Sequence, residues 1–333
     1  LDHHLHRLEQ FDLIRIRSFQ PELEYIFKHA LTQEVVYGGL LKRERQAVHE
    51  RIGLVMEQLF HERLSEFYET LAFHFKRGQS LHKAVDYLMK SGEKSLKRYA
   101  IEESHQYYQE AFDLLKNKTS MTDEEKRLLI DLLIKWALIF YYRGDFNGLV
   151  SLFRDHEGLA ESLTNKAEIG MFYGWLGLAL YCSGKAKSSY EYLCKALKTG
   201  EEIEDRRVIG YACAWLTWTC AELGLLGEAV AFGERAQDIS RSFESDQYLY
   251  FKSLGGLAYA YWHSGEAKKT LEAGRAILDY GERHSNIRSL VMGHWVMGEG
   301  YTMAGDYHSA IECLESGTRF SADPFYSQTL RLL

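Results

Sequence analysis

From residue 136 onward, apolar residues recur at a spacing of four residues, each time leading up to a glycine. The side chains four and eight residues before each glycine are apolar or aromatic in every case. Spacings of four and eight place side chains on one face of an α-helix. The glycines follow one another at intervals of 40 or 41 residues: Gly144, Gly184, Gly224, Gly265 and Gly305. The pattern predicts a series of similar helices, each ended by a structural turn at its glycine.

The residues after each glycine predict a second helix that packs on the first. Glycine readily adopts the left-handed backbone conformation that ends a helix in a tight turn. Five residues later the side chain is small in four of the five units, which allows two helices to approach closely. These small residues are Ser189, Ala229, Thr270 and Ala310. Helix pairs that repeat at a fixed period stack into a solenoid, whose core lies between neighbouring repeats.

One segment, WVMGEGYTMAGDYHSAIECLESG at 295–317, resembles the tetratricopeptide repeat. The family positions in it are occupied by Gly298, Tyr301, Gly305, Tyr307, Ala310 and Leu314. The usual unit has about 34 residues, so the longer period implies helices extended by most of a turn. The proline that usually closes each unit is absent. The resemblance implies an all-α fold, a tetratricopeptide-like superhelix of helix pairs.

The N-terminal part of the chain follows a different pattern. Residues 2–10 predict a short helix, and FDLIRIRS at 11–18 alternates between apolar and polar residues as a half-buried strand does. After a turn at Pro21, LEYIF at 23–27 predicts a second strand. A helix follows, with Thr32 as its expected N-terminal cap. This order is consistent with the later part of a winged-helix domain.

The patterns divide the chain into four regions. Gly78 and Tyr99 mark further helix boundaries, and Thr122 with Glu125 can form a capping box for a long helix. The expected regions are a winged-helix remnant with a connecting helix (1–62), the first irregular helical repeats (63–116), a linker (117–126) and long tetratricopeptide-type repeats (127–333).

The segment YIFKHALTQEVVYGGLLKRERQAVHERIG at 25–53 resembles the part that follows the ATPase core in bacterial signal-transduction ATPases with numerous domains (STAND). The resemblance is close over residues 5–115. It implies that the chain belongs to a larger signalling protein, often one with a class III adenylate/guanylate cyclase domain. The parent protein would bind ATP or ADP and Mg²⁺, and the winged helix would cover the nucleotide on the intramolecular ATPase domain.

In that family a histidine at the end of a winged-helix strand can sense the diphosphate of bound ADP, and His29 falls on this position. The alternative is a histidine that caps the strand end by bonding to the backbone. The chain contains no G-x-x-x-x-G-K-[ST] sequence, so it lacks a phosphate-cradling loop. His29 alone therefore gives the chain no nucleotide site.

Aromatic residues gather at positions three, six and ten before the turn glycines, and these positions face the concave side of such repeats. An inner surface of Tyr and Trp suits a protein or peptide partner, since these rings give contact area at low entropy cost. The opposite interpretation, that the rings pack the superhelix against itself, is equally open. The candidate partner-binding residues are Tyr141, Tyr181, Tyr211, Trp218, Glu222, Tyr259, Trp262, Trp295 and Glu299.

No residue pattern points to catalysis, a metal or a cofactor within the chain. G-x-S-x-G, H-E-x-x-H and C-x-x-C sequences are absent. His3, His4 and His6 lack cysteine or carboxylate partners at metal-binding spacing. His49 and His61 fall on one polar helix, where solvated or locally bonded rings are the expectation.

Charge and cysteine content favour a cytoplasmic protein without nucleic acid or membrane partners. The net charge is −7, and the basic cluster 42–51 is expected to be a solvated helix face. The longest apolar stretch, 128–142, contains Asp131 and Lys135 and is too short to span a bilayer. The five cysteines are an odd number without metal spacing, as expected of reduced buried thiols. The chain begins at Leu1 and not at a methionine, so we expect an excised piece of a longer protein or a processed product.

These observations predict a sensory and protein-interaction module that regulates an ATPase and cyclase output. One alternative is a fragment of a DNA-binding transcriptional regulator, in which residues 1–62 enter the major groove. Its support is the basic helix at 42–51. The other alternative is a plain assembly scaffold without signalling.

Overall fold

The computed structural model describes residues 2–19, 23–116, 118, 120–243 and 246–320. Apart from one two-stranded sheet, the regular structure in these residues is helical, which confirms the predicted all-α fold. Contacts within the chain define two compact units. One contains the residues up to 98 together with 106–114, and the other contains 99–105 and the residues from 115 onward. Each unit is described by itself.

The first unit has the predicted order of helix, strand, strand and helix at its start. Strands β1 and β2 pair antiparallel, with Ile14 opposite Phe27. The expected turn at Pro21 lies outside the described residues. The elements are α1 (Asp2–Gln10), β1 (Ile14–Ser18), β2 (Glu24–Phe27), α2 (Ala30–Gly39), α3 (Lys42–Leu59), the 3₁₀ helix η1 (His61–Glu66), α4 (Tyr68–Arg77) and α5 (Leu81–Lys97).

One local prediction in this unit is wrong. Helix α2 begins at Ala30, two residues before the expected cap Thr32, and its N-cap residue is His29. The Thr32 N–H bonds to the backbone carbonyl of His29 at 3.1 Å, so Thr32 already lies in the first helical turn. The helix can start earlier because the extended His29 already offers its backbone carbonyl to the N–H groups of Thr32 and Gln33.

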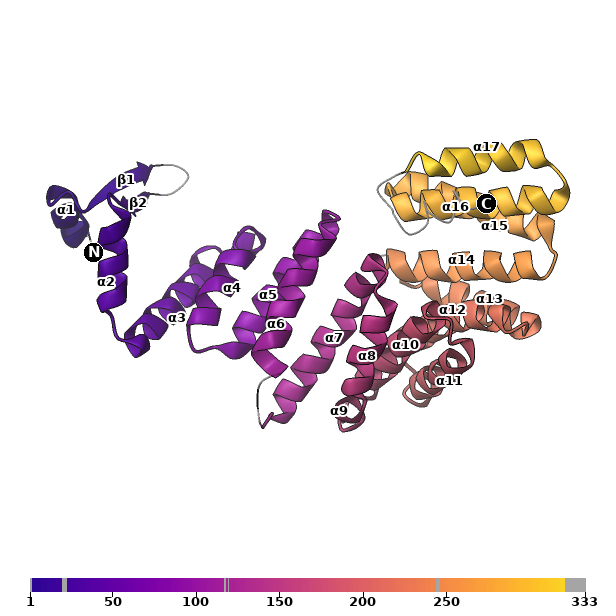
Figure 1. The fold of residues 1–333 in the computed structure, drawn as a ribbon, viewed down its shortest axis with the longest axis horizontal. Coiled ribbons are helices and arrows are strands. Elements are labelled where there is room, and N and C mark those ends of the chain that lie inside the picture. Colours follow the sequence, from indigo (N-terminus) through magenta and orange to yellow (C-terminus); the bar gives the residue numbers. More distant parts are fainter. Residues whose placement is uncertain (1, 20–22, 117, 119, 244–245, 321–333) are drawn as a thin grey trace. The chain divides into compact units, whose positions relative to one another are not determined.

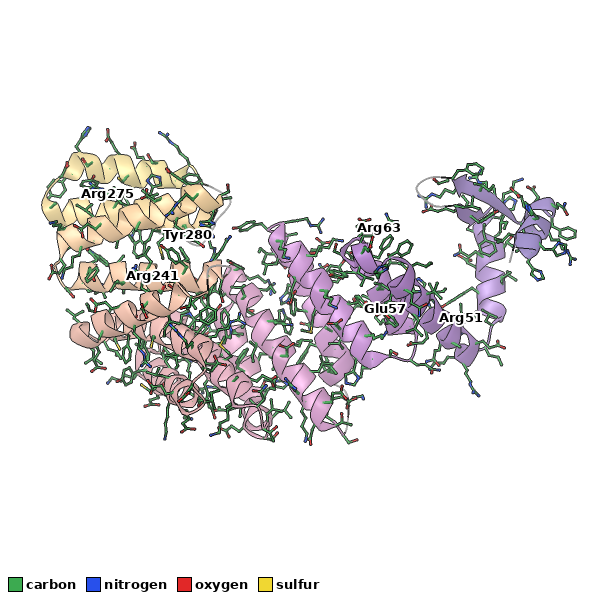
Figure 2. All side chains as sticks on the ribbon, turned by 180° about the vertical axis from the view of Figure 1, so that it is seen from behind. Arg51, Glu57, Arg63, Arg241, Arg275 and Tyr280 are labelled. Atoms are coloured by element: carbon green, nitrogen blue, oxygen red, sulfur yellow. The ribbon has the colours of Figure 1, made fainter. Side chains whose placement is uncertain are left out.

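Helices α3, α4 and α5 pack through a glycine contact and a shared carboxylate. A Cβ at Gly53 of α3 would lie 2.8 Å from the ring of Phe75, so glycine is needed for α3 and α4 to approach this closely. Glu57 of α3, marked in Figure 2, accepts a hydrogen bond from the Tyr87 hydroxyl at 2.7 Å and pairs with Lys83. These contacts hold α5 against α3.

The second unit is a stack of antiparallel helix pairs (Figure 1). Helix α6 (Ile101–Lys116) contributes residues to both units. The following helices are α7 (Asp123–Arg143), α8 (Phe146–Asp155), α9 (Glu157–Glu161), α10 (Lys166–Cys182), α11 (Ala186–Glu202), α12 (Arg206–Glu222), α13 (Leu226–Ser240), α14 (Gln247–His263), α15 (Ala267–His284), α16 (Ile287–Ala304) and α17 (Tyr307–Thr318). Rings mediate contacts between them: Tyr280 of α15, labelled in Figure 2, stacks on Tyr250 of α14 with the ring centres 4.2 Å apart.

All five repeat glycines occupy the predicted turn. Their φ angles lie between 70° and 78°, in the left-handed region. After each glycine, the next backbone N–H bonds to the carbonyl of the aromatic or apolar residue that the repeat places four positions before the glycine. The first of these bonds runs from Asp145 to Phe140 at 3.2 Å and the last from Asp306 to Tyr301 at 2.9 Å. This six-to-one bond closes the turn in every repeat.

Other predicted details of this unit are also confirmed. The small residues Ser189, Ala229 and Thr270 are completely buried between paired helices. Thr122 and Glu125 form both bonds of the capping box at the start of α7. Tyr99 takes the left-handed conformation expected of its turn, with φ 57°. None of the described helices combines the length and apolar character that a membrane span requires.

Candidate functional site

The predicted inner-face residues divide into a buried set and a half-buried set. Tyr141, Tyr211 and Trp218 are 2%, 6% and 7% exposed. Their polar atoms are used within the unit: the Tyr211 hydroxyl donates to Asp246 at 2.9 Å, and the Trp218 indole N–H donates to the carbonyl of Lys252 at 3.2 Å. These three side chains pack the repeats against one another.

Two buried cations, Lys252 of α14 and Arg288 of α16, lie among these rings. The Lys252 ammonium bonds to the Tyr141 hydroxyl at 2.6 Å and lies 4.6 Å from the centre of that ring. The Arg288 guanidinium lies 4.0 Å from the ring centre of Tyr142. Cation–ring and hydrogen-bond contacts compensate the loss of hydration of a buried charge. They join α7 to helices that follow it by more than 100 residues.

Sequence reasoning missed Lys252 and Arg288. The signal available was a charged residue inside an otherwise apolar stretch, as in YLYFKSLGGLAYAYW at 248–262. A cation in such a stretch indicates a buried partner. The ring that the cation contacts depends on the rotation of each repeat relative to the next. The sequence of a single repeat does not show this rotation.

The half-buried set gathers on α14 and α16, with Tyr181 of α10 near Tyr259. The ring centre of Tyr259 lies 5.5 Å from Trp262 and 6.2 Å from Trp295. Tyr259 also stacks on Trp218 at 4.8 Å and lies 4.2 Å from the ring centre of His263. Its hydroxyl donates a hydrogen bond to the exposed Glu222 at 3.2 Å.

A cavity of about 10 Å³ opens within this set, room for roughly one water molecule. Tyr259, Trp262, Trp295 and Glu299 line it, with Ala258, Thr270 and Val296. We call these four residues the α14–α16 recess. The Trp295 indole nitrogen and the Glu299 Oε1 are both buried, and apart from the contact between these two side chains neither has a hydrogen-bond partner among the described residues. Burial raises the pKa of the Glu299 carboxyl. A hydrogen bond from the Trp295 side chain and the electrostatic attraction of His263 lower this pKa, but their effects are smaller.

His29 lies exposed at the N-terminus of α2. Its backbone carbonyl accepts the N–H groups of Thr32 and Gln33, but its side chain does not cap the helix. The ring is therefore open to solvent at the end of β2, where the sensing hypothesis places it.

In the first unit, hydrogen-bond contacts connect the side chains of three residues, Tyr37, His49 and His74. The Tyr37 hydroxyl lies 2.9 Å from His49 Nε2, and His49 Nδ1 lies 3.0 Å from His74 Nδ1. Burial lowers the pKa of both histidines, and Arg77 adds to the effect. Tyr37 and His49 belong to the segment that carries the STAND resemblance, and His49 is 6% exposed rather than solvated. In the described residues, no three His, Cys, Asp or Glu side chains form a group that could hold a metal ion.

The chain matches no protein-family model. Over 108 residues it is 32% identical to an uncharacterised protein of Rhizobium meliloti (strain 1021). The matched part makes up 32% of this chain and only 10% of that relative, so the chain spans a small share of the relative's length.

Solved structures share the helical-repeat fold at low sequence identity. The apo form of RapI superposes with a TM-score of 0.63 at 11% identity, covering 84% of this chain and 98% of that one. The Rap conjugation gene regulator of plasmid pLS20, solved with the Phr* peptide, gives 0.56 at 14% identity, covering 88% and 96%. A STAND protein with a tetratricopeptide repeat sensor from Pyrococcus horikoshii gives 0.51 at 11% identity, covering 98% of this chain and 59% of that one. The fold is thus a tetratricopeptide-like helical repeat.

Proposed function

We propose that this chain is a protein-interaction and sensory module that holds a protein or peptide partner against the α14–α16 recess. The carrying observation is the recess itself: four of the residues predicted to face a partner line one cavity. Half-buried Tyr and Trp rings give a partner contact area at low entropy cost, so a cavity lined by three of them favours a bound segment there. The peptide complex of the pLS20 Rap regulator, a protein of similar fold, supports a peptide as the occupant.

Peptide selection tests this role. A random peptide library is displayed against the whole chain, and enriched peptides are measured by isothermal titration with the Trp262→Ala and Tyr259→Ala variants. We expect loss of at least about tenfold in affinity, or roughly 1.4 kcal/mol. The matched control is Tyr307→Ala on α17, a ring that is 66% exposed and outside the recess. No enrichment, or enriched peptides that bind all variants equally, would contradict the proposal.

The proposal extends to regulation of an ATPase in a larger protein, with an adenylate or guanylate cyclase as its output. Helix α2 has no buried residue, and Leu31 and Val35 are each 73% exposed, while Leu41 is 70% exposed. Leu31 and Val35 lie one helical turn apart on α2, and exposed apolar side chains grouped on one face favour an interaction site. The winged-helix remnant would place this face, and His29, against the intramolecular ATPase domain. ATP or ADP and Mg²⁺ would bind there, and the chain itself would carry no cofactor and no catalytic residue.

The cytoplasm is the compartment that suits this role. The described structure has its five cysteines unpaired. Burial raises the pKa of Cys213 and of Cys220 to about 12, so both thiols stay protonated and unreactive at neutral pH. Such thiols fit a reducing environment. We also propose that the chain is divided into the four regions expected from its sequence: 1–62, 63–116, 117–126 and 127–333.

A further inference from the structure

Helix α3 carries a row of exposed apolar side chains. Val48, Ile52, Val55 and Leu59 are 46%, 37%, 43% and 68% exposed, and we call these four residues the α3 stripe. They follow one another at spacings of four, three and four residues, so they lie along one side of the helix. Single exposed apolar residues are ordinary on a protein surface, whereas a continuous row of them indicates an interaction site.

Another side of α3 is packed within the first unit and fixes the helix in place. His49 and Gly53 are its buried residues, and a Cβ at Gly53 would lie 2.8 Å from the ring of Phe75 on α4. Glu57 accepts a hydrogen bond from the Tyr87 hydroxyl of α5 at 2.7 Å. The α3 stripe is therefore a preformed surface on a helix that is already anchored.

The charged residues of α3 differ in how they are bonded. Its three carboxylates all accept hydrogen bonds within the unit: Glu44, Glu50 and Glu57. Among the described residues, none of its four cations is in an ion pair: Lys42, Arg43, Arg45 and Arg51. Arg45 lies 5.3 Å from the ring centre of Tyr37, and Arg51 is exposed and labelled in Figure 2. The charge that α3 offers to a partner is therefore positive.

Spacing and charge together select the occupant of the stripe. Spacings of four and three residues are those of a coiled-coil seam, whereas a helix on a membrane surface has a wider apolar face. A helix that reads DNA needs polar side chains toward the base edges, which the stripe lacks. A second copy of α3 would bring like charges together, because the carboxylates already bond elsewhere. An acidic amphipathic helix satisfies both the spacing and the charge.

We propose that the α3 stripe docks an acidic amphipathic helix of a partner protein, whose carboxylates pair with Arg45 and Arg51. Arg45 continues the row three residues before Val48, and Arg51 flanks it beside Ile52. Both cations are placed to meet acidic residues along the seam of a partner helix. This surface is separate from the α14–α16 recess, so the inference goes beyond the proposed peptide binding and does not depend on it.

Two designed peptides test the inference on the whole chain. Both have three heptads with leucine at the two seam positions, and the flanking positions carry glutamate in the acidic peptide and lysine in the basic one. Like charges at these positions keep each peptide from pairing with itself. Fluorescence anisotropy should show saturable binding of the acidic peptide with a Kd on the order of 10 μM, and at least about tenfold weaker binding of the basic peptide. Equal binding of the two peptides, or no saturation with the acidic one, would overturn the proposal.

Substitutions locate the binding surface. The double variant Val48→Ser/Val55→Ser should weaken binding of the acidic peptide at least about tenfold. Arg51→Glu should weaken binding of the acidic peptide and strengthen binding of the basic one. The matched controls are Ile311→Ser on α17, a 56% exposed apolar side chain, and Arg275→Glu on α15, an exposed cation labelled in Figure 2. Losses in the controls as large as those in the stripe variants would contradict the assigned surface.

Melting temperatures distinguish a lost contact from a lost fold. If the double variant is unfolded, Leu59→Ser takes its place, since this side chain is 68% exposed, and it too should weaken binding of the acidic peptide. Trp262→Ala in the recess should leave that binding unchanged. Loss of binding in Trp262→Ala, with none in the stripe variants, would show that the peptide binds at the recess and that the α3 inference is wrong.

Two further measurements test the other occupants. We expect the chain and the Val48→Ser/Val55→Ser variant to sediment alike, and neither to bind vesicles of phosphatidylcholine and phosphatidylglycerol through the stripe. A dimer that the double variant dissociates would show that a second copy covers the stripe. Vesicle binding that the double variant abolishes, without binding of the acidic peptide, would assign the stripe to a membrane surface. Either result would overturn the proposal.

Discussion

At the scale of single residues, Lys252 of the second unit is a charged side chain that is only 5% exposed. A buried ammonium costs several kcal/mol of lost hydration unless hydrogen bonds and aromatic faces replace the water. The Tyr141 hydroxyl supplies an oxygen at 2.6 Å, and it comes from a helix 111 residues earlier in the chain. The stability of the stack therefore depends on a contact between distant repeats.

Replacing Tyr141 by phenylalanine tests this contact. The Tyr141→Phe variant keeps the ring and removes the oxygen that bonds to Lys252, so we expect the free energy of unfolding to fall by about 1.5–3 kcal/mol. Urea unfolding followed by tryptophan fluorescence measures it. The control is Tyr307→Phe, at a 66% exposed ring, where a change below about 0.5 kcal/mol is expected. Equal effects of the two variants would refute the role of the hydroxyl.

The histidine pair of the first unit predicts a pH dependence. Burial is the main cause that lowers the pKa of His49 and His74, with Arg77 and, for His74, the neighbouring His49 adding to it. The folded state therefore prefers neutral rings, and the unfolded state takes up protons first, near pH 6.5. The stability is fully present above that pH and is lost as the pH falls from there through the lowered folded values.

We expect the urea midpoint of the first unit to fall between pH 7.5 and pH 5, and His74→Gln to fall less steeply. Hydrogen exchange of the α2 and α3 amides measures the stability of this unit, because the contact between Tyr37 and His49 joins these two helices. His61→Gln, whose ring is 72% exposed, is the matched control and should keep the slope of the unsubstituted chain. An unchanged slope in His74→Gln would show that the pair does not titrate as described.

At the scale of elements, the turn glycines were the most predictable feature of the chain. Glycine is the least strained residue in a turn that needs a positive φ angle. The spacing between the turn glycines therefore gives the length of the repeat directly. The capping box of Thr122 and Glu125 was predictable for the same reason, because it is local. Helix α9 (Glu157–Glu161) was not, since five residues after α8 carry no periodic signal.

Two glycines next to one turn give a matched pair of substitutions. At Gly224, with φ 75°, alanine forces a side chain into the left-handed region, and we expect a loss of about 1–2 kcal/mol. At Gly227, in the first turn of α13 and with nothing within 4 Å of an added Cβ, alanine should be neutral or stabilise by up to about 1 kcal/mol. The shift of the urea midpoint measures both. Changes of the same sign would contradict the assigned backbone roles.

At the scale of the whole molecule, the sequence predicted the class of fold but only part of the candidate site. Period and turn residues are repeated local signals, so the stack of helix pairs followed from them. The inner-face positions also followed from the period, but the split between buried Tyr141, Tyr211 and Trp218 and half-buried Tyr259 and Trp262 did not. That split depends on how far each repeat rotates against the next, which is set by packing across repeats.

The exposed face of α2 leads to a prediction about the larger protein. Leu31 and Val35 are each 73% exposed, so the double variant Leu31→Ser/Val35→Ser loses no buried contact in this chain. We expect its melting temperature to stay within about 2 °C of the parent value, because surface substitutions change stability by less than about 0.5 kcal/mol. If the chain regulates an ATPase in a larger protein, as proposed above, the same pair in that protein should alter the rate of ADP release, measured with a fluorescent ADP, because the apolar face would no longer dock on the ATPase domain. A matched control is Glu34→Ser on the same helix, an exposed polar side chain. If ADP release were unchanged by the double variant, or changed equally by Glu34→Ser, the α2 face would not be the surface through which the module acts on the ATPase.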